Sequence, residues 1–187
     1  MAIKATICRA ALQIADMDRN YYHDHVLTIA RHPSETDERM MVRVLAFALH
    51  ASDTLSFGKG LSVEDEPDLW QKDLTGAIQT WIDVGQPDDK RIRKACGRAD
   101  QVCVYCYGGH ASKLWWGQIS DKLERTRNLT VKSLPQLASK ALASLADRNM
   151  QLNCTIQDGQ IWLANEKETV QMELETVKLS PPPDHKP

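Results

Sequence analysis

The chain has 187 residues, a formal net charge of −2 at pH 7 and 26% charged residues. This length suggests one domain, long enough to bury a core without disulfide bonds to hold it together. The slightly acidic balance excludes a protein that coats nucleic acid through bulk positive charge, although it leaves room for a local basic patch.

The five cysteines are odd in number, and neither a secretory segment nor an apolar run of membrane-spanning length is apparent. We therefore expect free thiols, a reducing cytoplasmic location and no membrane partner.

The N-terminal part predicts a β-hairpin, with strands at 2–15 and 21–31 joined at 16–20. His32 and Pro33 then end the second strand. Ser34 and Asp37 fit a capping box, so a helix is predicted from Ser34 to about residue 52.

Three strands are predicted next, at 55–57, 69–72 and 78–84, of which the last has the clearest pattern. A helix from Pro87 to about residue 99 follows, and then a strand at 102–107 that is apolar on both faces. The strand–helix–strand unit over 78–107 should form a right-handed parallel crossover.

The remainder predicts a helix at 111–125, a strand at 129–134, a short helix at 136–145 and an antiparallel meander at 150–156, 160–164 and 169–177. Residues 1–178 are thus expected to form one domain, followed by a Pro-rich tail at 179–187. The predicted fold class is α/β, with a mixed β-sheet and flanking helices.

Asp83 lies near the exit of the strand at 78–84 and shares one face of it with Trp81 and Gly85. A carboxylate at this place is costly to bury unless it has a partner or a metal ion. It can therefore bind a cation, or it can cap the next helix or pair with an arginine.

Asp68 follows Pro67 and precedes two apolar residues that draw its backbone toward the core. Two converging carboxylates, from Asp68 and Asp83, suit Mg²⁺, which often takes one or two carboxylates together with substrate phosphate. Glu38, on the flank of the predicted helix, is the third candidate ligand; the alternative is a first-turn glutamate that stabilises the helix dipole or pairs with a nearby base.

The helix at 87–99 is strongly basic, and it carries Lys90, Arg91 and Lys94. A solvated face explains most of these cations. The functional alternative needs one of them to lean over the strand end, where Gly85 leaves room. By turn count Lys94 is the first candidate and Arg91 the second.

Cys103 and Cys106 form a CxxC pattern, but within a strand two residues three apart point to opposite faces. These two sulfurs are therefore not expected to bind one metal ion or to form a disulfide.

Several ordered segments resemble the bacterial YaeQ family, over about residues 1–178. They are Ala-Arg-His-Pro-Ser-Glu-Thr at 30–36, Asp-Glu-Pro-Asp-Leu-Trp at 65–70, Trp-Ile-Asp-Val-Gly-Gln-Pro-Asp at 81–88, Arg-Ile-Arg-Lys-Ala-Cys at 91–96 and Ile-Gln-Asp-Gly-Gln-Ile-Trp-Leu at 156–163.

The resemblance implies a variant of the PD-(D/E)XK nuclease-like core, whose element order is αβββαβ, with an added N-terminal hairpin and C-terminal meander. It implies Asp68, Asp83 and Glu38 as metal ligands. The motif lysine falls on Gly85, so a displaced Lys94 becomes the catalytic candidate.

The expected function is Mg²⁺-dependent hydrolysis of a phosphodiester in nucleic acid, with Lys94 stabilising charge and with Arg91 and Lys90 guiding the substrate backbone. The alternative is a catalytically inactive module with a nuclease fold that binds a nucleic acid or a protein partner, the latter linked to transcription.

Overall fold

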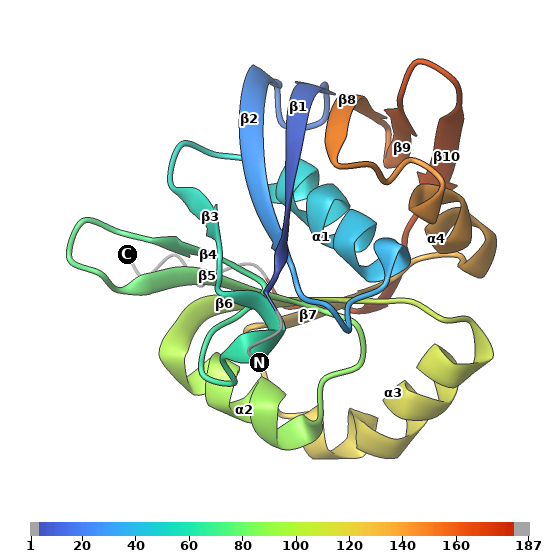
Figure 1. Cartoon of the computed structure of the whole chain (residues 1–187). Coiled ribbons are helices and arrows are strands. Elements are labelled where there is room, and N and C mark those ends of the chain that lie inside the picture. The colour runs from blue at the N-terminus through green and yellow to red at the C-terminus, as the bar shows by residue number, and fades with distance from the viewer. Residues whose placement is uncertain (1–3, 182–187) are drawn as a thin grey trace.

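The computed structural model describes residues 4–181; the last part of the expected tail, 182–187, lies outside the described residues. Two β-sheets and four helices form the fold (Figure 1). The helices are α1 (Asp37–His50), α2 (Asp89–Arg98), α3 (His110–Leu123) and α4 (Gln136–Ala143). None of the described helices is long and apolar enough to cross a membrane.

The first sheet has the strand order β10-β9-β8-β1-β2. It joins the N-terminal hairpin to the C-terminal meander, because β1 pairs with β2 in antiparallel and with β8 in parallel. Its strands are β1 (Thr6–Asp16), β2 (Tyr21–Arg31), β8 (Asn149–Gln157), β9 (Gln160–Ala164) and β10 (Thr169–Glu173).

The second sheet has the order β11-β7-β6-β5-β4-β3. Its strands are β3 (Leu55–Phe57), β4 (Leu69–Lys72), β5 (Ile78–Val84), β6 (Ala99–Cys106), β7 (Leu129–Ser133) and β11 (Glu175–Lys178), and a 3₁₀ turn (Gly60–Ser62) precedes β4. The predicted order α-β-β-β-α-β from residue 37 to 106 is confirmed, as is the parallel β5–α2–β6 crossover.

The α/β class with mixed sheets and flanking helices is confirmed, but two finer expectations about the architecture were wrong. The strands form two sheets rather than one mixed sheet, and the last predicted strand, 169–177, is divided between them. Leu174 separates β10 from β11, and β11 crosses over to pair with β7. The first sheet needs the pairing of β10 to β9, whereas the second needs a strand to cover the outer edge of β7.

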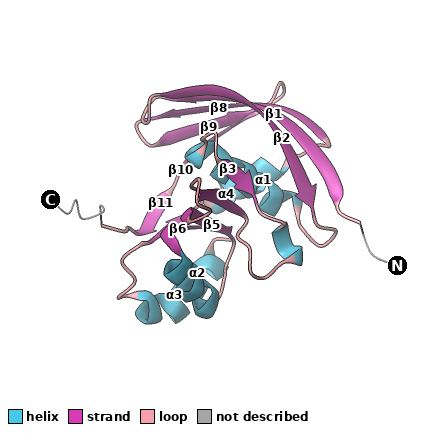
Figure 2. Ribbon diagram, turned by 90° about the vertical axis from the view of Figure 1, so that its left-hand side faces the viewer, coloured by secondary structure: helices cyan, strands magenta, loops and turns pink. Residues whose placement is uncertain are grey.

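The core lies in two layers on either side of the second sheet (Figure 2). The larger layer packs α1 between the two sheets, which explains why every residue of α1 from Met40 to Ala48 is buried. The smaller layer packs α2 and α3 against the opposite face, around Trp81 and Ile92. Cys103 packs against the larger layer and Cys106 belongs to the smaller one, so the two sulfurs face opposite sides as predicted.

Helix α1 begins later than its sequence suggested. Thr36, and not Ser34, is the N-cap, and its hydroxyl accepts a hydrogen bond from the backbone N–H of Arg39 at 3.1 Å. Ser34 instead bonds the ring of His32 at 2.6 Å. Threonine caps a helix by the same chemistry as serine, so the N-cap moves by two residues along the chain, from Ser34 to Thr36.

Candidate functional site

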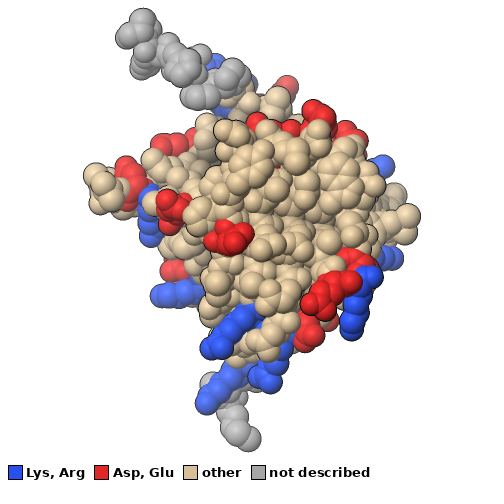
Figure 3. Space-filling model, turned by 90° about the horizontal axis from the view of Figure 1, so that it is seen from above, with Lys and Arg blue, Asp and Glu red and all other residues tan. Residues whose placement is uncertain are grey.

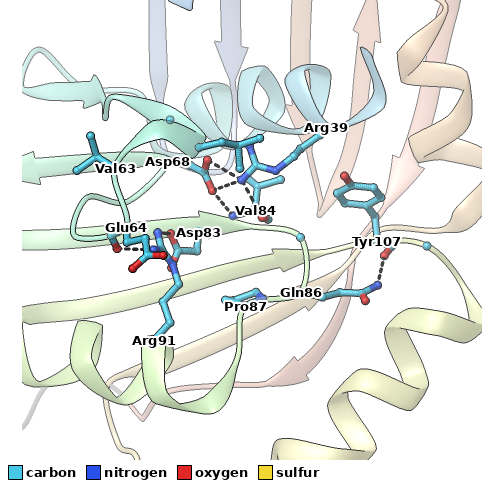
Figure 4. Close-up of a pocket in the computed structure, with 14 residues that line it drawn as sticks. Arg39, Val63, Glu64, Asp68, Asp83, Val84, Gln86, Pro87, Arg91 and Tyr107 are labelled. Carbon is cyan, nitrogen blue, oxygen red and sulfur yellow. Dashed lines mark hydrogen bonds and ion pairs between the residues drawn. The ribbon is translucent and has the colours of Figure 1, made fainter. Parts of the chain in front are cut away.

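Asp68 and Asp83 lie together at the edge of the second sheet. Strands β4 and β5 are antiparallel, and Leu69 pairs with Ile82, so the next position in the register brings the two aspartates opposite one another. Both line a cavity of about 570 Å³ whose other walls are the loop before β4 and the turns after β5 and β6 (Figure 4). The pairing predicted from the sequence is therefore present in the geometry.

Asp68 is buried and fully engaged. One nitrogen of Arg39 donates to both of its oxygens, at 2.8 and 2.9 Å, and the backbone N–H of Val84 donates to one of them at 2.8 Å. Burial raises the pKa of Asp68, while the positive charge of Arg39 opposes that shift. The same Arg39 nitrogen also approaches the carbonyl of Val84 at 3.3 Å.

Asp83 is held by a second arginine. The guanidinium of Arg91 donates to its two oxygens at 2.8 and 2.9 Å, and the indole N–H of Trp81 adds a third bond at 3.1 Å. The hydrogen bonds that Arg91 donates to Asp83 raise the pKa of Arg91 above its ordinary value. The sequence left three possibilities for Asp83: a bound cation, a helix cap or an ion pair with an arginine. The structure contains the ion pair, with Arg91.

Arg91 also fastens the loop that covers the cavity. Its Nη1 donates to the carbonyl of Glu64 at 2.6 Å, and its Nη2, which also bonds Asp83, donates to the carbonyl of Glu66 at 2.8 Å. The side chain of Asp88 caps α2 by accepting from the N–H of Arg91 at 2.7 Å, which orients the first turn toward the strand end. One guanidinium thus joins β5, α2 and the loop before β4 (Figure 4).

Two further charged residues, Glu35 and Arg43, extend the site beneath Arg39, and the sequence motifs did not indicate them. Arg39 bonds Glu35 at 2.9 Å, and Glu35 also binds Arg43 at 2.7 Å. The side chains of Glu35 and Arg43 are only 2% and 1% exposed. The spacing of four residues between Glu35, Arg39 and Arg43 was the available signal, because such residues share one helix face.

Glu38 is not in the cavity. Its carboxylate accepts a hydrogen bond of 2.7 Å from the hydroxyl of Ser139, on α4. Consecutive residues of a helix point about 100° apart. Since Arg39 faces the second sheet, Glu38 turns toward α4, and the expectation that it would join the two aspartates does not hold in this geometry.

Lys94 does not approach Gly85 either. Its amine pairs with Asp65, in the loop before β4, and neither Lys94 nor Lys90 is among the residues that line the cavity. Arg91 stands in the first turn of α2, whereas Lys94 is about one turn farther from the strand end. Lys94 was the first candidate for a cation of this helix that leans over the strand end, and Arg91 was the second. In the structure Arg91 does so and reaches Asp83.

Gly85 has a backbone reason to be glycine. Its φ is +102°, a conformation that L side chains rarely adopt, although no atom lies within 4 Å of where a Cβ would be. A lysine at this position would strain the turn that leads from β5 into α2. The turn geometry, rather than lack of space, keeps a side chain away from this point.

The donor set around the two aspartates does not fit a divalent cation. All four carboxylate oxygens already accept hydrogen bonds from Arg39, Arg91, Trp81 or the N–H of Val84. A bound Mg²⁺ would lie between two guanidinium groups and compete with both. Within residues 4–181, no group of three or more histidines, cysteines, aspartates or glutamates is arranged to hold a metal ion.

Residues 1–174 of this chain match the family model described as "YaeQ protein". The chain belongs to the YaeQ family. A protein named "Uncharacterized protein YaeQ" from Salmonella typhi is 45% identical over 174 residues, which is 93% of this chain and 96% of that protein. The protein of the same name from Escherichia coli K12 is 44% identical over the same shares.

Two solved YaeQ structures have the same fold. The YaeQ protein from Xanthomonas axonopodis pv. citri superposes with a TM-score of 0.91 at 50% identity, covering 95% of this chain and 99% of that one. The YaeQ protein from Pseudomonas syringae gives a TM-score of 0.90 at 33% identity, with 94% and 97% covered. The overall fold of this chain is thus shared with both of these YaeQ structures.

Proposed function

We propose that this YaeQ protein is a non-catalytic binding module built on a PD-(D/E)XK nuclease-like core, and that its partner is a nucleic acid. The observation that carries the non-catalytic part is the engagement of every oxygen of Asp68 and Asp83 by arginines and N–H groups. The αβββαβ order of residues 37–106 supports the relation to the nuclease core.

The cavity itself is a poor place for an anion. Its charged lining consists of Arg39 and Arg91 against Asp68, Asp83 and Glu64, so the guanidinium charges are already matched. A phosphate there would have to displace carboxylates that each hold two or more hydrogen bonds. Binding of a nucleic acid through the cavity is therefore not part of the proposal.

The surface of α2 and α3 fits a phosphate backbone better. Helix α2 has five cations in ten residues, of which Arg91 and Lys94 are already paired with acids outside the helix, and Asp89 is its one acid. Asp89 is shared between Arg93 and Lys122, at 2.7 and 3.4 Å, so these two cations exceed the charge of their partner. Cations that outnumber local acids on one helix face attract nucleic acid without base specificity.

Fluorescence anisotropy with labelled single-stranded and double-stranded DNA and RNA tests this proposal. We expect binding that weakens as salt rises. Lys90→Ala together with Lys122→Ala should weaken every complex and lower the slope of log K against log salt by about two. Lys140→Ala with Lys167→Ala, on exposed sites of α4 and the β9–β10 loop, is the matched control and should leave both unchanged.

Incubation of the same oligonucleotides with Mg²⁺ or Mn²⁺ tests the non-catalytic part. We expect no cleavage and no rise in thermal stability with either ion. Divalent-ion-dependent cleavage that Asp83→Asn abolishes would overturn the proposal in favour of hydrolysis. Absence of binding to all four nucleic acids would overturn the choice of partner and leave a protein as the alternative.

A further inference from the structure

The outer face of the first sheet is large and nearly free of charge. Side chains at alternate positions of its five strands point away from α1, and only Arg9, Asp24 and Glu173 among them are charged. Charged residues make up 26% of the whole chain. The view from above shows this broad uncharged surface, with most of the lysines and arginines at its margins (Figure 3).

The uncharged side chains on this face are ten neutral polar residues together with small, aliphatic and two aromatic ones. Val26 is 84% exposed and Tyr22 58% exposed, and Trp162 is half-buried. Interfaces are depleted of charge at their centre and enriched in aromatic residues. The other outward residues are Ile7, Ala11, Gln13, Ala15, Thr28, Ala30, Asn149, Gln151, Asn153, Thr155, Gln157, Gln160, Ala164, Thr169 and Gln171.

We infer that this face binds a second copy of the chain, so that two sheets pack face to face in a two-fold symmetric dimer. Its five strands have 11, 11, 9, 5 and 5 residues. With a rise of about 3.3 Å per residue and a spacing of about 4.8 Å between strands, the face covers about 650 Å². Two such faces would bury about 1,300 Å² when they overlap completely, which is at the lower end of the range of specific interfaces.

Two of the three charges on the face, Arg9 and Glu173, are complementary under a two-fold rotation. One row of the register runs through Gln13, Asn153 and Thr169, by way of Ala164. Arg9 lies four residues before this row on β1, and Glu173 lies four residues after it on β10. Consider a two-fold axis that lies in the plane of the interface and crosses the line from Arg9 to Glu173 at its midpoint and at a right angle. Rotation about this axis would place Arg9 of each copy over the partner's Glu173.

The same axis passes close to the centre of the sheet, so it leaves the two faces largely overlapped. Neither residue is in an ion pair within the described part of the chain; Glu173 accepts a bond of 2.7 Å from the amide of Gln160. The dimer would leave α2 and α3 of both copies outward, because these helices cover the far side of the second sheet (Figure 2). The inference is therefore independent of the proposed binding of nucleic acid.

Sedimentation velocity of the full chain, from about 1 to about 100 µM, tests the inference. We expect a species of twice the 21.1 kDa chain mass that gains population with concentration. Gln151→Arg, near the centre of the face, should raise the dissociation constant at least about tenfold, because it places an unpaired charge in the interface. Gln118→Arg, an exposed glutamine of α3, adds the same charge outside the interface and should leave the constant unchanged.

Charge exchange tests the particular arrangement. Arg9→Glu and Glu173→Arg should each weaken the dimer, and the double variant should restore most of its affinity. Circular dichroism and thermal melts of each variant establish that the fold is kept. A monomer throughout the concentration range, a dimer that Gln151→Arg leaves intact, or a double variant as weak as the single ones would each overturn the inference.

Discussion

Replacement of Arg91 by methionine should destabilise the protein by about 3 kcal/mol. The change removes two hydrogen bonds to Asp83 and two to the carbonyls of Glu64 and Glu66. The Asp83 side chain is 3% exposed and would keep only its bond from Trp81. Breaking a buried ion pair costs about 3–5 kcal/mol. Arg91 is 29% exposed, so water reaches part of the gap and the lower end of that range applies.

Chemical denaturation measures this loss directly, and a thermal melt should fall by about 6–12 °C for a domain of this size. Asp83→Asn in the Arg91→Met background should recover more than half of the loss, because it removes the unpaired charge. Arg93→Met is the matched control: Arg93 pairs with Asp89 on the same helix but is 54% exposed, so about 0–1 kcal/mol is expected. If Arg91→Met costs no more than Arg93→Met, the arginine does not hold Asp83 and the argument for a non-catalytic site fails.

Burial lowers the pKa of His50 to about 4, below its ordinary value of 6.5. The folded state then binds fewer protons than the unfolded one between these values, so stability should fall by up to about 3 kcal/mol as pH drops from 6.5 to 4. The ring of His50 bonds the hydroxyl of Tyr105 at 2.6 Å, and a glutamine can keep that bond. The unfolding free energy of His50→Gln, measured by denaturant titration, should therefore depend less steeply on pH in this range than that of the unmodified protein. An equal dependence on pH would contradict the assignment of this effect to His50. Burial also raises the pKa of Cys96 and Cys103 to about 11, so both thiols should react with iodoacetamide at pH 8 far more slowly in the folded than in the unfolded protein. Thr36→Ala removes the cap of α1 and should lower the unfolding free energy by about 1 kcal/mol, as denaturant titration can measure; no change would mean that water replaces the hydroxyl.

Local patterns in the sequence predicted most of the secondary structure. Period-two alternation located β5, the apolar run at 102–107 located β6, and Asp158-Gly159 located the turn between β8 and β9. Such signals depend on neighbouring residues alone. The division of the strands into two sheets depends on which strands find each other, and the pairing of β1 with β8 joins residues about 140 apart in the chain.

The pair of aspartates was also predictable, because an acid lies beside each of two neighbouring predicted strands; the observed register then places Asp68 opposite Asp83. That each carboxylate bonds an arginine was not predictable from the sequence. Four-residue spacing indicates that Glu35, Arg39 and Arg43 share a face, but it does not tell which of their atoms meets Asp68.

By itself, the sequence determined the order of elements, the paired aspartates just before β4 and near the end of β5, the opposite directions of the two CxxC sulfurs and membership of the YaeQ family. Only the tertiary structure decided that Arg91 rather than Lys94 reaches Asp83, that Glu38 turns to α4, and that an uncharged sheet face is left open. The reason is physical. Whether a buried carboxylate binds a metal ion or an arginine depends on which long side chain, from another element, can reach it within about 3 Å, and local sequence patterns do not contain that distance.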